Sequence, residues 1–102
     1  MDTHIIEPGQ ILHARWGYDQ TNATFFKVLA RRGQWVVIQP LSTEEAWRGD
    51  TMTGTATPSA KLDGKPIRRK VRGNGNWEAI KVKSYMYASP WDGEPVRISC
   101  YA

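Results

Sequence analysis

Lysine and arginine side chains concentrate between residues 61 and 83, where eight of them stand against two acidic residues and give a net charge of +6. The chain as a whole carries a formal net charge of +4. A local excess of positive charge attracts anionic partners. Trp77, Tyr85, Tyr87 and Trp91 follow closely along the chain. Because nucleic-acid bases stack on aromatic rings while cations bind phosphates, this pattern is typical of a nucleic-acid-binding surface.

The candidate phosphate contacts lie on two segments joined by Gly73-Asn74-Gly75-Asn76, a strong hairpin signal. If the apolar residues of both segments point inward, alternation sends one set of cations to the outer face: Arg68, Lys70, Arg72, Lys81 and Lys83. Arg69 would then point inward, and its charged group would have to reach solvent at the rim of the barrel. A different interpretation is equally open, in which the charges protect an exposed edge strand from pairing with other chains.

A second candidate site is the segment from Trp16 to Phe26, where aromatic and short polar side chains alternate around a bend. Asp19 and Asn22 can bond nearby backbone N–H groups and so build a turn. In the alternative, the bend presents a recognition cluster. Its members would be Trp16, Tyr18, Asp19, Gln20 and Asn22.

Acid–base or metal chemistry would have to use His4, His13, Asp19, Asp92 or Cys100. None of these residues stands at the spacing of a catalytic dyad or of metal ligands. No phosphate-binding loop and no nucleophile motif is present. We therefore expect no enzymatic activity, no metal and no cofactor.

The 102 residues fit a single domain, residues 1–102, with 40% hydrophobic and 24% charged residues. The sequence shows no membrane span and no signal peptide. A lone cysteine, Cys100, cannot form an internal disulfide, which favours a reducing, cytoplasmic setting.

Short alternating or β-branched runs separated by turn signals predict the fold. Strands are expected at 10–16, 23–31, 35–39, 67–72, 77–88 and 96–101. Residues 1–9 are expected to form an N-terminal arm. Residues 42–66 are expected to form an irregular insertion loop, with one helical turn at Ser42–Arg48 and a weak strand at 51–57. The sequence thus predicts an all-β domain, a small antiparallel barrel (SH3-like or OB-like) of about five to seven short strands. A two-layer sandwich is the alternative.

The Trp16–Asn22 run with Phe25-Phe26 resembles a family of small uncharacterised bacterial and bacteriophage proteins, whose signature is W-G-Y-[DE]-Q-T-N-x-x-F-[YF]. Arg68–Val71, the W-D-G-x-P motif at Trp91–Pro95 and the terminal Tyr101-Ala102 are similar to later parts of that pattern. The resemblance spans nearly the whole chain. It implies a free-standing domain, often encoded by phages or integrated elements, and it carries no catalytic residues.

Together these features predict a non-catalytic binding module, a phage-encoded accessory protein that acts on a host protein. The alternative is a small nucleic-acid-binding barrel that uses the basic 61–83 region. A membrane partner is not expected, and an enzyme is the remote alternative.

Overall fold

The computed structural model describes residues 5–17, 21–48, 53–73 and 77–99, and these form β-strands and their connections without a helix. The strands are β1 (Ile11–Trp16), β2 (Asn22–Arg32), β3 (Trp35–Trp47), β4 (Thr53–Leu62), β5 (Ile67–Gly73), β6 (Glu78–Lys83), β7 (Met86–Pro90) and β8 (Val96–Ser99). All of them pair antiparallel. The predicted all-β class is confirmed.

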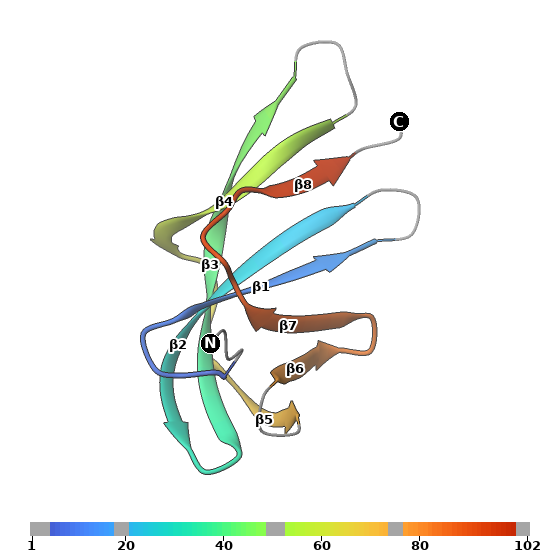
Figure 1. Cartoon of the computed structure of the whole chain (residues 1–102). Helices are drawn as coiled ribbons and strands as arrows, with labels where there is room; N and C mark the ends of the chain where they lie inside the picture. The colour runs from blue at the N-terminus through green and yellow to red at the C-terminus, as the bar shows by residue number, and fades with distance from the viewer. Residues whose placement is uncertain (1–4, 18–20, 49–52, 74–76, 100–102) are drawn as a thin grey trace.

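Six strands close into a barrel in the order β2-β1-β7-β6-β5-β3, because β3 also pairs with β2. Closure satisfies the strand edges that an open sheet would expose. The remaining strands, β4 and β8, extend the sheet beyond β3. Figure 1 shows them at the end of the molecule where β3 continues past the barrel. The predicted small antiparallel barrel is therefore confirmed.

The long strand β3 belongs to both parts of the molecule. Its first residues, from Trp35 to Ile38, pair with β5, and its second half, as far as Trp47, pairs with β4. The helical turn predicted at Ser42–Arg48 is wrong, since Ser42 to Trp47 belong to β3. The irregular loop predicted for residues 42–66 is also wrong, because β4 occupies Thr53–Leu62 and so extends well beyond the weak strand expected at 51–57.

Two hydrophobic clusters lie on opposite faces of β2. Phe26 and Val28 point into the barrel, where they pack with residues such as Leu12 and Ile80. Phe25 points the other way, into a second cluster under β4 and β8. Both phenylalanines are buried, since neighbouring residues of a strand face opposite sides of a sheet.

One ion pair fixes the N-terminal segment against the barrel. Arg31 at the end of β2 and Glu78 at the start of β6 form a bidentate pair, with Nη2 donating to Oε2 at 2.9 Å. The backbone of Ile6 joins both partners: its N–H donates to Glu78 at 2.9 Å, and its carbonyl accepts from Arg31 at 2.8 Å. Ile6 is fully buried, so this part of the predicted arm is packed against the core.

We expect Glu78→Ala to destabilise the fold by about 3 kcal/mol, because the partly buried Arg31 guanidinium and the Ile6 N–H both lose their acceptor. Urea unfolding at pH 7 measures the loss. Glu45→Ala on the exposed part of β3 is the control, with an expected change below about 0.5 kcal/mol. Equal unfolding midpoints for the two variants would contradict the role of the pair.

Candidate functional site

The predicted recognition cluster at the bend lies only partly within the described residues. Tyr18, Asp19 and Gln20 lie outside them, while Trp16 and Asn22 stand opposite each other in the β1–β2 register. The Trp16 indole N–H donates to the Thr24 hydroxyl at 2.9 Å, and its ring packs partly against the barrel core. These contacts give Trp16 a structural role at this end of the barrel.

Trp91 also has a structural role. Its ring meets Phe25 edge-on, with centroids 5.6 Å apart and planes at 77°, and so helps to cover the second cluster. Its indole N–H donates to the Glu94 carbonyl at 2.7 Å. As a result, little of the polar edge of Trp91 is left for a partner.

The basic segment behaves as its alternation predicts. Val71 of β5 stands opposite Ile80 of β6, and both are buried in the barrel. Arg69 leaves the core at the rim, where its Nε donates to the Val82 carbonyl at 3.2 Å. The five cations of the outer face, which we call the basic face, are all exposed: Arg68, Lys70, Arg72, Lys81 and Lys83. Their outward orientation is confirmed.

The registers of four strands place aromatic residues at both ends of this face. Trp35 of β3 pairs with Lys70, and Tyr87 of β7 pairs with Lys81. Lys70 and Lys81 each adjoin the inward pair Val71–Ile80, so both point outward at neighbouring positions. Trp35 is 43% exposed and Tyr87 is 53% exposed. We call this series the cross-strand row: Trp35, Lys70, Lys81 and Tyr87.

Almost no negative charge opposes the basic face. In β5, β6 and β7 the one acidic residue is Glu78, and Arg31 neutralises it. The Arg31 guanidinium holds the pKa of the Glu78 carboxyl below its usual value, so this carboxyl stays ionised and committed to its partner. The positive potential of the face is therefore left to attract an anion.

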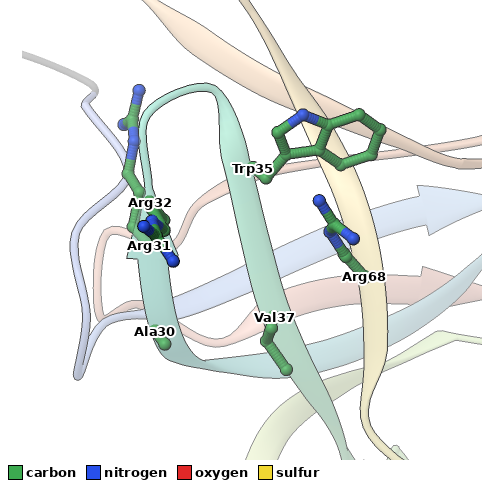
Figure 2. Close-up of a pocket in the computed structure, with 6 residues that line it drawn as sticks. All are labelled: Ala30, Arg31, Arg32, Trp35, Val37 and Arg68. Atoms are coloured by element: carbon green, nitrogen blue, oxygen red, sulfur yellow. The ribbon is translucent and has the colours of Figure 1, made fainter.

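A hollow of about 780 Å³ adjoins the row on the outer surface of β2, β3 and β5. Its walls carry arginine side chains and the Trp35 indole, while Ala30 and Val37 form an apolar floor (Figure 2). The residues that line it are Ala30, Arg31, Arg32, Trp35, Val37 and Arg68. The Arg68 guanidinium lies over the Trp35 ring, 4.5 Å from its centroid. Such a cation–π contact holds both groups in place.

Sequence reasoning missed Arg32 and Trp35. The signal that could have found Trp35 is alternation, since Val36 and Ile38 are buried and Trp35 must point outward. What the local sequence does not show is that β3 lies beside β5, which brings Trp35 next to Lys70.

Among the residues considered for acid–base chemistry, His13 and Asp92 lie within the described part of the chain. Burial lowers the pKa of His13, and the charge of Asp92 partly offsets this effect. The described residues contain no group of three or more His, Cys, Asp or Glu side chains that could hold a metal. No helix among them is long and apolar enough to cross a membrane.

Comparison with protein-family models, curated proteins and solved structures gives no match to this chain.

Because burial lowers the pKa of His13, the unfolded chain binds a proton that the folded chain does not. We therefore expect stability to fall as the pH drops below 6.5, the usual pKa of histidine, until the pKa of the folded state is reached. His13→Gln should flatten this part of the stability profile. A titration of the His13 ring by NMR, assigned through that variant, provides the direct measurement, and a pKa above 6.5 would contradict the argument.

Proposed function

We propose that this protein is a non-catalytic binding module that binds single-stranded nucleic acid along the outer face of β3, β5, β6 and β7. The observation that carries the proposal is the cross-strand row, in which two exposed lysines lie between two exposed aromatic rings. Lysines bind phosphates, and aromatic rings stack on bases of any sequence. The binding should accordingly depend on salt and show little sequence preference.

The aromatic ends of the row favour a single strand over a duplex. In a duplex the base faces are stacked on each other, so Trp35 and Tyr87 could reach only phosphates and sugars. In a single strand the bases can turn toward the protein. Three strand-to-strand steps separate the two rings, or about 14 Å at the usual spacing of strands. The two lysines between them would contact the phosphates that link the stacked bases.

The strand order argues against edge protection as the reason for the basic face. Charges that discourage aggregation belong on strands with an unpaired edge. Here β5 pairs with both β3 and β6, and β6 pairs with both β5 and β7, so neither is an edge strand. The pairing of both strands on two sides makes edge protection a weaker explanation and supports a functional reason for the charges.

A host protein is the second candidate partner, and it rests on the resemblance to phage-encoded proteins together with a cytoplasmic setting. The centre of a protein–protein interface is usually depleted of charge, and of lysine in particular. The middle of the cross-strand row is formed by Lys70 and Lys81. The composition of this face consequently favours a polyanion over a protein surface.

The double variant Lys70→Ala/Lys81→Ala should weaken binding to a single-stranded oligonucleotide and lower the slope of log K against log salt by about 0.7 for each phosphate that is no longer neutralised. Fluorescence anisotropy at several salt concentrations measures both quantities. The matched control is Lys27→Ala/Arg97→Ala, which removes two exposed charges from β2 and β8. If the two double variants bind alike, the row is not the site, and absence of binding by the parent protein at low salt would make a protein the favoured partner.

The variants Trp35→Ala and Tyr87→Ala test the stacking contacts. Each should cost about 1–3 kcal/mol of binding to single strands, the range for one stacked base, and much less for a duplex. Tyr87→Phe keeps the ring and should bind like the parent protein. Equal losses for single and double strands would show that these residues do not stack on bases.

A further inference from the structure

The hollow beside the cross-strand row arises from the order of small and large residues on paired strands. On the outer face, Arg32 stands opposite Trp35, and the next outward pair is Ala30 opposite Val37. On the other side of β3, Arg68 pairs with Val37. The small Ala30 and the short Val37 thus lie between longer side chains, which leaves an apolar floor below two guanidinium groups and an indole.

We propose that this hollow is a nucleotide subsite, which takes a base together with the phosphate attached to it. The inference rests on the proposed function and adds a defined position for one nucleotide, either the 5′ end of a bound strand or a free mononucleotide. Trp35 and the Arg68 stacked on it would hold the base, and Arg32 would bind the phosphate. Arginine suits both tasks, because its guanidinium stacks on planar rings and forms paired hydrogen bonds with phosphate oxygens.

The two arginines at the end of β2 differ in a way that supports this assignment. Arg31 is committed, since it binds Glu78 and also donates from Nε to the Gly33 carbonyl at 2.9 Å. Arg32 is exposed and has no carboxylate partner among the described residues. In Figure 2 the Arg32 side chain and the Trp35 indole lie on opposite strands of the hairpin, with Arg68 beside the indole. An anion placed between Arg32 and Trp35 would contact the Arg32 guanidinium, which pairs with no carboxylate among the described residues.

Size and pre-organisation agree with a nucleotide. A volume of about 780 Å³ lies within the range of about 300–1,000 Å³ typical of small-molecule sites. The Arg68–Trp35 contact already orders the stacking surface before a ligand arrives. Ordering in the free protein lowers the entropic cost of binding.

The extension of the sheet offers a matched control. A second hollow, of about 400 Å³, is lined by Trp47 and Arg97 and so combines the same two residue types. It lies on β3, β4 and β8, away from β5 and the basic face. Arg97→Ala therefore removes an arginine beside a tryptophan without touching the proposed subsite.

The test is an NMR titration of the ¹⁵N-labelled protein with 5′-AMP, adenosine or inorganic phosphate. The indole N–H signal of Trp35 is identified by its absence from the Trp35→Phe spectrum. We expect 5′-AMP to shift this signal saturably and to bind at least about tenfold more tightly than adenosine or phosphate, each of which makes only part of the contacts. Arg32→Ala should weaken 5′-AMP about tenfold, whereas Arg97→Ala should leave its affinity unchanged.

Anisotropy with a single-stranded oligoadenylate, made with and without a 5′-phosphate, separates the two sources of the nucleotide. Tighter binding of the phosphorylated strand, abolished in Arg32→Ala, identifies a strand end. Equal binding of the two strands, with 5′-AMP still bound, identifies a free mononucleotide.

The inference is overturned if 5′-AMP leaves the Trp35 signal in place, or if Arg32→Ala behaves like Arg97→Ala. In that case binding of both oligonucleotides would leave the proposed function intact. If instead neither oligonucleotide binds at low salt, the proposed function fails on its own, and the 5′-AMP titration still decides whether the hollow is a nucleotide site.

Discussion

Phe25 and Phe26 are consecutive, and both are buried, so β2 needs apolar cover on its two faces. The pleat of a strand allows no other outcome, because neighbouring side chains point to opposite sides. The barrel core covers one face, around Phe26. The strands β4 and β8, with Trp91, cover the other face around Phe25. Covering β2 in this way uses the apolar residues of the extension and leaves the outer surface of β5, β6 and β7 in solvent, where the basic face lies.

Local pattern was enough to predict the strands whose alternation is regular. The inward direction of Ile80 and Val82 fixes the outward direction of Lys81 and Lys83, whatever the rest of the fold. Local pattern failed between Ser42 and Trp47, where hydroxyl and glutamate residues imitate the start of a helix. In the fold this segment pairs with β4 along most of its length. Distant strand pairing of this kind overrides a weak helix signal, and a single sequence does not reveal it.

The candidate site was predictable in its charged part and at Tyr87, but not at Trp35 or Arg32. Lys70 and Lys81 belong to neighbouring segments, and the hairpin signal between these segments predicts that the two lysines lie close together. Trp35 lies beside them because β3 pairs with β5, although β4 separates these two strands in the sequence. Arg32 is brought to the site by the β2–β3 hairpin. Trp91, in contrast, has the residue type of a binding aromatic but is used to cover a core. Residue type thus identified the chemistry, while topology decided which aromatic residues could take part in it.

The arrangement of charge on β5 and β6 is difficult to explain by stability alone. Lys70 and Lys81 adjoin the Val71–Ile80 pair on neighbouring strands and point to the same side, and like charges in such positions repel each other. Both strands lie inside the barrel wall, each with a neighbouring strand on two sides. Each lysine also has an aromatic residue as its other cross-strand neighbour, Trp35 for Lys70 and Tyr87 for Lys81, and neither ring carries a negative charge to offset the repulsion. A bound phosphate backbone would supply that charge. If a phosphate backbone binds here, relief of this repulsion would add to the free energy of binding. That would be a physical reason to keep lysines at positions where stability alone favours threonine or valine.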